Sequence, residues 1–381
     1  MKVNIEEVIY EYSVRNKLDE DIPVYSVTNN KGFCTGYFSK DVASKDKSTY
    51  KIVPQGYFAY NPSRINVGSV DWQRYKEKVI VSPLYVVFGV LEKINQQYLF
   101  HYLKSDIILT YIKEYATGSV RDNLKLSELG KFPINLPPLD EQHRVAAVLD
   151  KVSDLIALRK KQLAKLDELV KARFVEMFGD PVLNPKCLIN VSLDELADII
   201  SGITKGRKTN NVELFEVPYM AVSNVKAGYI DWTNIKTIEA TKAEIDQYRL
   251  QPFDILMTEG GDPDKLGRGA IIDMPPFNCI HQNHIFRVRV DKKRIFPQYL
   301  EEYLQHSKAK LYFLDCAKQT TGIASINMKQ LKRLPILLPM FEEQQQFADF
   351  VEQVEKQKLI VKQSLEKLET LKKSLMQEYF G

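Results

Sequence analysis

The 381-residue sequence contains only four cysteines, and they lie far apart at Cys34, Cys187, Cys279 and Cys316. Without a CxxC pair or another closely spaced set, the sequence predicts neither a disulfide framework nor a zinc knuckle. This spacing is best explained by a reducing, cytoplasmic environment.

Long apolar runs are also missing. The first residues, MKVNIEEVIYEYSV, have no apolar core of signal-peptide length, and no other stretch approaches the length of a membrane span. We therefore expect neither secretion nor membrane insertion. With 44% hydrophobic and 27% charged residues, the chain is typical of globular proteins and long enough for two or more domains.

The net charge of +4 is too small to indicate a partner by itself, but its distribution is informative. Residues 1–135 contain 18 basic and 15 acidic side chains, and residues 181–335 contain 21 and 18. The two globular stretches thus carry the positive excess, which suits a polyanionic partner without requiring one.

Motifs of common enzymes are absent or incomplete. No GxxxxGK[ST] loop occurs, and Gly267 and Gly269 form an isolated GxG that is typical of a turn. The segment Met274–Phe277 (MPPF) is similar to the NPPF motif of amino-methyltransferases. Met274, however, replaces the polar residue that must accept hydrogen bonds from the target amino group. The sequence therefore predicts no methyl transfer by this chain.

A nuclease with a metal ion is the enzymatic alternative that stays open. Pro263 and Asp264, followed by Asp291 and Lys293, form a loose PD…DxK pattern whose carboxylates would hold Mg²⁺. In a chain with 49 acidic and 53 basic residues such a pattern arises often, and Asp291 begins a DKKR segment typical of a solvated turn.

Cys279, His281 and His284 provide metal-ligating atoms but not a convincing metal site. Three side chains on one short strand cannot all face one ion, because successive side chains alternate between the two faces. We expect no catalytic residue and no metal site on this chain.

The most informative feature of the sequence is an internal repeat. The segment Pro133–Val152 (PINLPPLDEQHRVAAVLDKV) aligns without a gap with Pro335–Val354 (PILLPMFEEQQQFADFVEQV), and the register continues until Phe178-Gly179 meets Phe380-Gly381. Two unrelated Leu-, Lys- and Glu-rich helices would not share these proline, Glu-Gln and Phe-Gly positions. Looking for repeats first matters because they define the architecture.

Weaker similarities in the same order extend the repeat to the preceding stretches. They are Ile22–Asn29 with Val217–Asn224, Gln97–Leu103 with Gln298–Leu304, and Thr117-Gly118 with Thr321-Gly322. We therefore divide the chain into a first globular domain at 1–135, a helix at 136–180, a second globular domain at 181–337 and a second helix at 338–381. Divergence between the landmarks fits either different specificities or neutral drift.

Each copy predicts a short strand, 132–136 or 334–338, that leads into a long helix with acidic residues in its first turn. A helix of about 38 residues is roughly 57 Å long, which suits a spacer. Apolar residues at alternating steps of four and three predict a coiled-coil seam. The seam comprises Val145, Leu149, Val152, Ile156, Leu163, Leu166, Val170, Phe347, Val351, Val354, Val361, Leu365, Leu368 and Leu375.

Charged residues interrupt the seam at Arg159 and Arg173 in the first copy and at Lys358 and Lys372 in the second, and the other copy is apolar at each position. Additional apolar residues widen it beyond what a two-stranded coil buries. These are Leu155, Leu158, Leu169, Phe350, Leu359 and Leu371. We expect a helix of another protein to pack there, the alternative being contact with the chain's own globular domains.

The globular stretches predict a mixture of helices and strands. Short runs of Val, Ile, Tyr and Phe at 78–90 and 284–290 are typical of strands, whereas 192–200 and 297–313 have helical spacing.

The two copies of the LPPxxEQ turn, Leu136–Gln142 and Leu338–Gln344, with their helices ending in Phe-Gly, resemble the specificity subunit of type I restriction-modification enzymes. The similarity covers the whole chain and includes Tyr60–Arg64, Val67–Ser69 and Asp254–Thr258. Met340, where the first copy has Pro138, is a mild departure.

The resemblance implies an α+β fold with two target recognition domains, each followed by a long helix. The two helices would form an antiparallel coiled coil with pseudo-twofold symmetry, and Gly381 would end close to Met1. It also implies that each domain reads one half of a bipartite site in double-stranded DNA and that the helices set the spacer. Two methyltransferase subunits, which supply the S-adenosylmethionine chemistry, and nuclease-translocase subunits, which use ATP and Mg²⁺, would be the partners. No cofactor is then expected on this chain.

Basic and amide-bearing residues in loops with Gly or Pro are the candidates for contacting DNA. They are Asn61, Arg64, Asn66, Lys205, Arg207, Lys208, Lys265 and Arg268. A coiled-coil scaffold that binds only protein is the competing hypothesis. It explains the helices but not two divergent domains.

Overall fold

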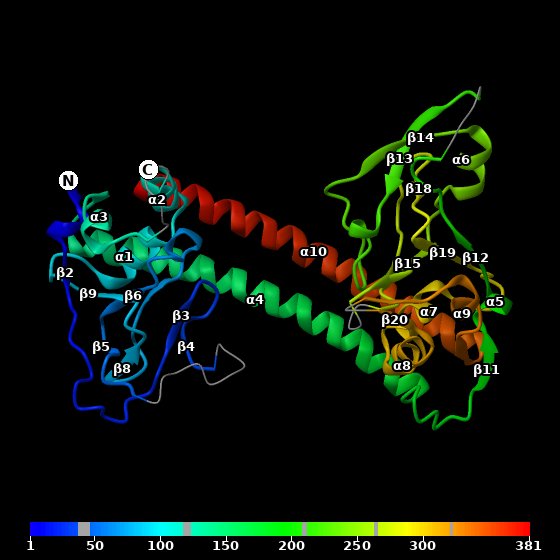
Figure 1. Cartoon of the computed structure of the whole chain (residues 1–381), viewed down its shortest axis with the longest axis horizontal. Helices are drawn as coiled ribbons and strands as arrows, with labels where there is room; N and C mark the ends of the chain where they lie inside the picture. Colours follow the sequence, from blue (N-terminus) through cyan, green and yellow to red (C-terminus); the bar gives the residue numbers. More distant parts are fainter. Residues whose placement is uncertain (37–45, 117–122, 208–211, 263–265, 321–322) are drawn as a thin grey trace. The chain divides into compact units, whose positions relative to one another are not determined.

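The computed structural model describes residues 1–36, 46–116, 123–207, 212–262, 266–320 and 323–381. The chain forms two compact units (Figure 1). Unit 1 comprises Met1–Lys161 and Lys362–Gly381, and unit 2 comprises Gln162–Val361. Two 40-residue helices, α4 (Leu139–Phe178) and α10 (Phe341–Phe380), therefore contribute one part to each unit.

A four-stranded antiparallel sheet forms the centre of unit 1. Its order is β2 (Ile9–Glu11), β9 (Val86–Val90), β6 (Phe58–Tyr60) and β7 (Val70–Trp72). Three strand pairs and several short helices surround it: β1 (Lys2–Asn4) with β10 (Pro133–Asn135), β3 (Ser26–Thr28) with β4 (Gly32–Cys34), β5 (Lys51–Pro54) with β8 (Lys78–Val81), η1 (Ile5–Glu7), η2 (Ile65–Val67), α1 (Gln96–Leu103), α2 (Asp106–Ala116) and α3 (Leu126–Leu129).

Unit 2 repeats this central sheet in the same order. Its strands are β12 (Ala197–Ser201), β19 (Ile285–Val290), β15 (Ile255–Thr258) and β17 (Gly269–Ile271). The elements that match those of unit 1 are β11 (Ile189–Ser192) with β22 (Pro335–Leu338), α5 (Leu193–Leu196), α7 (Pro297–Gln305), α8 (Ser307–Cys316) and α9 (Met328–Lys332). The sequence repeat is therefore a repeat of the fold.

The units differ in what is inserted into this common skeleton. Unit 2 contains a sheet of β14 (Lys236–Ala240), β13 (Phe215–Met220) and β18 (Ile280–His281), with helices η3 (Val222–Asn224) and α6 (Lys242–Tyr248). A further sheet joins β16 (Gly260–Gly261), β21 (Ile323–Ser325) and β20 (Lys318–Thr320). In place of the β14–β13–β18 sheet, unit 1 has the pairs β3–β4 and β5–β8. Most of the unit 1 stretch that corresponds to β20 and β21 lies outside the described residues.

Most of the predicted elements are confirmed, and one is wrong. The strands before the long helices and the strands within 78–90 and 284–290 are present. The helical spacing at 192–200 is misleading, because only Leu193–Leu196 is helical and Ala197–Ser201 is strand β12. Pairing with β19 along five residues outweighs the weak helical pattern.

The Phe-Gly ends of the long helices are anchors in the two cores. In unit 1 the Phe380 ring lies 5.1 Å from the ring of Tyr98 and 5.5 Å from that of Tyr102. In unit 2 the Phe178 ring lies 4.9 Å from that of Tyr299. The core of unit 1 thus includes the end of α10, which follows the second globular stretch in the sequence. The core of unit 2 includes the end of α4, which follows the first.

A buried glutamine ties the start of each long helix to its domain. Gln142 is fully buried, and its side chain accepts a hydrogen bond from Asn95 N at 2.8 Å and donates to the Lys93 and Pro137 carbonyls at 3.1 and 2.8 Å. Gln344 makes the matching bonds to Phe296 N and to the Arg294 and Pro339 carbonyls. The conserved spacing of the two Glu-Gln pairs therefore has a structural cause.

Within each unit, a part of α4 packs against a part of α10. In unit 1 the N-terminal part of α4 meets the C-terminal part of α10, where Lys160 and Glu369 form an ion pair of 2.9 Å. In unit 2 the C-terminal part of α4 meets the N-terminal part of α10, with Asp167 and Lys358 2.6 Å apart. The helices are therefore antiparallel. None of the helices in the described part of the chain has an apolar stretch that would span a bilayer.

Candidate nucleic-acid interface

One end of the central sheet of unit 1 gathers polar loop residues. Because β6 is antiparallel to β9 and β9 to β2, the end of β6, the start of β9 and the end of β2 lie at the same edge. A cavity of about 420 Å³ opens there. It is lined by Glu11, Asn61, Pro62, Ser63, Leu84, Val86, Asn123, Lys125, Leu126 and Ser127.

Two hydrogen bonds connect the polar residues at this edge. The Ser63 hydroxyl donates to Asn123 Oδ1 at 2.7 Å, and Asn61 Oδ1 accepts from Ser63 N at 3.1 Å. The side-chain NH₂ group of Asn61 makes no hydrogen bond to another described residue. A preorganised amide with a free donor can read the edge of a base.

The other two unit 1 candidates lie next to this cavity without lining it. Arg64 is exposed and precedes η2, and Asn66 is partly buried within η2. No described residue forms an ion pair with Arg64, so its guanidinium remains available for a phosphate or a guanine base.

The corresponding edge of unit 2 has a different chemistry. Here β15 ends at Thr258, and Glu259 Oε2 lies 2.6 Å from His284 Nδ1. The buried Thr258 hydroxyl and the buried Nε of Arg268 have no hydrogen-bond partner among the described residues. This edge therefore holds unused hydrogen-bonding groups, Arg268 among them. Lys265 lies outside the described residues.

The segment after β12 carries the remaining candidates. Gly202 is required there because a Cβ atom would lie 1.9 Å from the His281 carbonyl oxygen of β18. Lys205 is exposed. Lys208 lies outside the described residues.

Arg207 already has an ion-pair partner. Its Nη2 atom lies 2.6 Å from Glu244 Oε2 and 3.0 Å from the Glu239 carbonyl. The hydrogen bond from Arg207 is the main cause that lowers the pKa of Glu244 to about 2. Glu244 also accepts from the backbone of Thr241, the residue that caps α6. The structure thus gives Arg207 a role in holding α6 in place.

The predicted seam residues differ in burial along the helices. Those that are buried are Val145, Leu149, Val152, Leu166, Val170, Phe347, Val354 and Val361. Those that are partly buried are Ile156, Leu163, Val351, Leu365, Leu368 and Leu375. Phe350 is partly buried, whereas Leu155, Leu158, Leu169, Leu359 and Leu371 are exposed.

The residues singled out for metal chemistry do not converge. Burial raises the pKa of the Cys279 thiol to about 12 and lowers that of His281 to about 4, and the Nδ1 atom of His281 faces the Tyr248 carbonyl at 3.1 Å. His284 instead pairs with Glu259. No group of ligands suited to a metal ion occurs among the residues with described positions.

The PD…DxK pattern is not supported where it can be followed. Asp291 Oδ1 accepts from Lys293 N at 3.0 Å, as in a turn. This turn follows the last residue of β19, while Thr258 pairs with the first residue of that strand. Pro263 and Asp264 lie outside the described residues.

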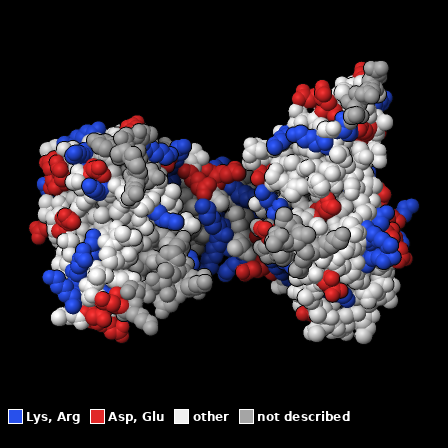
Figure 2. Space-filling view, viewed as in Figure 1, with Lys and Arg blue, Asp and Glu red and all other residues white. Residues whose placement is uncertain are grey.

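Charge alone does not reveal the interface. On the face shown in Figure 2, basic and acidic side chains are interspersed on both units rather than gathered in one basic patch. The loops at the sheet ends therefore stand out by geometry and hydrogen-bonding chemistry. The sequence missed Leu84, Asn123 and the Glu259–His284 pair because strand register, not a local motif, brings them to these edges.

Comparison with known proteins agrees with the duplicated fold. The family model described as "Type I restriction modification DNA specificity domain" matches residues 7–168 and again 188–370. The chain is 24% identical over 303 residues to the type I restriction enzyme EcoKI specificity subunit of Escherichia coli, covering 74% of this chain and 64% of that protein. It is 32% identical over 188 residues to the putative MjaX specificity subunit of Methanocaldococcus jannaschii, covering 49% and 44%. The chain thus spans less than two thirds of these relatives.

Solved structures have the same fold. The type I restriction-modification S subunit from M. genitalium superposes with a TM-score of 0.58 at 14% identity, covering 100% of this chain and 96% of that one. A chain from a study of the assembly and conformational transition of a type I restriction-modification system gives a TM-score of 0.56 at 18% identity, covering 100% and 97%. Since the family model matches both repeats and most of the sequence, this chain belongs to the type I restriction modification DNA specificity family.

Proposed function

We propose that this chain is the DNA sequence-specificity subunit of a type I restriction-modification system and is not itself an enzyme. The observation that carries the proposal is the repetition of one skeleton with two different loop edges. Target recognition domain 1 spans 1–135 and domain 2 spans 181–337, and the conserved helices span 136–180 and 338–381. Each domain reads one half of a bipartite site in double-stranded DNA.

The polar edges at the sheet ends are the reading surfaces. Asn61 in domain 1 offers a free amide donor, and Arg268 in domain 2 offers a partly exposed guanidinium group. Contacts from such groups to base edges in the major groove specify sequence, whereas Arg64, Asn66 and Lys205 position the duplex through its phosphates. Lys208 and Lys265 join this second group by their charge. Arg207 acts indirectly, by holding α6 through Glu244.

A footprint of the assembled methyltransferase complex tests this proposal. We expect two protected half-sites separated by an unread gap. Protection no greater than that of bulk DNA would instead favour a protein-only scaffold. Cleavage of DNA by the purified chain with Mg²⁺ would favour the nuclease alternative.

Single substitutions test the assignment of the edges. Arg268→Ala is expected to weaken binding of the complex by roughly ten- to hundredfold and to relax sequence preference in one half-site only, because one good base contact contributes about 1–3 kcal/mol. Lys329→Ala, which replaces an exposed lysine of α9 in the same unit, is the matched control. Equal loss in both half-sites would contradict the assignment.

The helices set the spacer and dock two methyltransferase subunits. Aliphatic side chains are exposed at matching positions of the two copies, Leu158 with Ile360 and Leu169 with Leu371, with exposed fractions of 60%, 67%, 46% and 47%. Two like surfaces suit two like partners. Those partners carry S-adenosylmethionine, and the nuclease-translocase subunits, which carry ATP and Mg²⁺, join afterwards. Acting on DNA, the assembly belongs in the cytoplasm.

Leu158→Glu and Ile360→Glu test the docking surface. Each exposed position tolerates a charge, so folding is expected to persist while one of two methyltransferase subunits is lost from the complex, measured by its mass in solution. The double variant is expected to lose both. Retention of two subunits by the double variant would contradict the proposal.

A further inference from the structure

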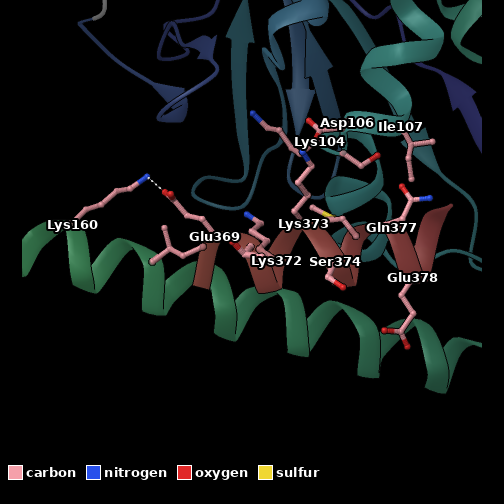
Figure 3. A pocket seen from close by; sticks show the side chains of 14 residues that line it. Lys104, Asp106, Ile107, Lys160, Glu369, Lys372, Lys373, Ser374, Gln377 and Glu378 are labelled. Carbon is pink, nitrogen blue, oxygen red and sulfur yellow. Dashed lines mark ion pairs between the residues drawn. The ribbon is translucent and has the colours of Figure 1, made fainter. Parts of the chain in front are cut away.

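A second polar cavity lies in unit 1, away from the sheet edge. It has a volume of about 870 Å³ and is bounded by the junction of α1 and α2 and by facing parts of α4 and α10 (Figure 3). Four lysines line it: Lys104, Lys160, Lys372 and Lys373. Figure 3 shows Lys104 approaching from the globular domain and Lys372 and Lys373 from α10.

Three acidic side chains, Asp106, Glu369 and Glu378, also line the cavity, but among the described residues none of them forms an ion pair with Lys104, Lys372 or Lys373. Glu369 is engaged by Lys160 at 2.9 Å. Lys372 is partly buried, and no carboxylate of a described residue lies within ion-pair distance of its ammonium group. Lys104 donates to the Gly68 carbonyl and, at 3.1 Å, to the Asn29 carbonyl, so its hydrogen-bond partners are neutral, and Asp71 acts on it only at longer range.

Burial and repulsion from a neighbouring lysine act on the ammonium groups of both Lys104 and Lys372. Burial is the main cause that lowers the pKa of Lys104 to about 8, and Lys372 lowers it further while Asp71 opposes the shift. The pKa of Lys372 is lowered by burial and by Lys160, and Asp150 opposes this. An anion between these lysines would relieve both effects.

In unit 2, buried apolar side chains occupy the same position. Val170 occupies the place of Lys372 and is buried, and Phe174 occupies the place of Met376. The Phe174 ring stacks on that of His306, 4.6 Å away, where unit 1 has Ser105. The apolar version of this site is therefore compatible with the fold, and packing alone does not require a lysine at 372.

From these juxtapositions we infer that the cavity between α1–α2 and the helix pair of unit 1 binds a phosphate group through Lys372 and Lys373, with Lys104 adding its charge. Ammonium groups bind phosphate as point charges, and several of them match a group with two negative charges better than a single carboxylate. Ser374 and Gln377 add hydrogen-bond donors at the wall. This site is separate from the reading edges and goes beyond the proposed function.

Two sources can supply the phosphate: a free phosphate compound or the backbone of DNA. Calorimetric titration of the full chain with inorganic pyrophosphate tests the first. We expect binding that Lys372→Val weakens by roughly tenfold or more, because a hydrogen bond to a charged group contributes about 1.5–3 kcal/mol. Lys372→Val copies Val170 and should fold. Lys372→Arg should retain binding, and Lys367→Ala, on the exposed side of α10, is the matched control.

The second arm uses the assembled complex and a duplex without a target site. If the DNA backbone is the source, Lys372→Val reduces the slope of log affinity against log salt by about 0.9 for one lost phosphate contact. Weaker pyrophosphate binding with an unchanged slope identifies a free phosphate compound. No pyrophosphate binding together with an unchanged slope overturns the inference. Neither result depends on the footprint, which tests the proposed function separately.

Discussion

Units 1 and 2 have the same skeleton, and their described residues differ mainly in three places. The central sheets have the same strand order, and a buried glutamine ties each domain to its long helix. In each domain two tyrosine hydroxyls also donate to carbonyls of the strand before that helix. The units differ in the strands inserted after the first sheet strand, in the loops at the sheet edge, and in the wall that faces the helix pair. Scaffold positions are thus retained while surfaces that meet ligands diverge, as expected for two domains that read different half-sites.

The largest expected difference between the units is in the stability cost of a substitution at the wall that faces the helix pair. Phe174 is fully buried and contacts the rings of Tyr299, Phe178 and His306, whereas Met376 borders the open cavity. Phe174→Ala is expected to lower the free energy of unfolding by about 3–5 kcal/mol. Met376→Ala should cost about 2 kcal/mol, since solvent already reaches this site. Urea unfolding measures both, and equal costs would show that the cavity is closed in solution.

Replacing Gln142 or Gln344, in contrast, should lower the free energy of unfolding by the same amount in both units. Gln142→Leu and Gln344→Leu each remove three hydrogen bonds and leave the amide of Asn95 or of Phe296 without its acceptor. Each is expected to cost about 2–3 kcal/mol, the penalty of an unsatisfied buried group together with the lost bonds. Gln353→Leu, at an exposed position of α10, is the control. A cost in only one unit would contradict the equivalence of the two anchors.

Gln142 and Gln344 illustrate which features of the fold could be predicted from the sequence. The repeat predicted that Gln142 and Gln344 are equivalent, because identical spacing survives where an identical bond is needed. It also predicted the long helices and the strands that precede them. Strand β12 was missed because its pairing with β19 depends on residues about 90 positions away, which local periodicity does not report.

The reading edges and the cavity were harder to predict for the same reason. Ser63 and Asn123 are 60 positions apart in the sequence and meet only because of the fold. Arg207 appeared to be a free base in a Gly-containing loop, yet its partner Glu244 lies in a helix 37 positions later. The break of the seam at Lys372 was visible in the sequence, but the cavity beside it was not.

The two units should respond in opposite directions to acid. In unit 1, burial is the main cause that lowers the pKa of His101, although Asp150 lies 2.7 Å away and opposes the shift. A histidine with a lowered folded pKa gives stability that is present above its unfolded value, near 6.5, and is lost as the pH falls. In unit 2, burial is the main cause that raises the pKa of Glu301 to about 7. The stability that Glu301 contributes is present below about pH 4.5 and is lost as the pH rises through 7.

Two variants separate these contributions. Between pH 7.5 and 5, His101→Asn should remove part of the acid-induced loss of stability in unit 1. Glu301→Gln keeps an oxygen that accepts the hydrogen bond from Ile271 N, formed at 2.8 Å, and should remove an acid-induced gain of about 2 kcal/mol in unit 2. Urea unfolding at both pH values, followed by hydrogen exchange of β9 and β19, assigns each change to its unit. Proton linkage fixes the sign of each effect. The prediction is therefore contradicted if both variants change the stability of the same unit, or if both change the pH dependence of stability in the same direction.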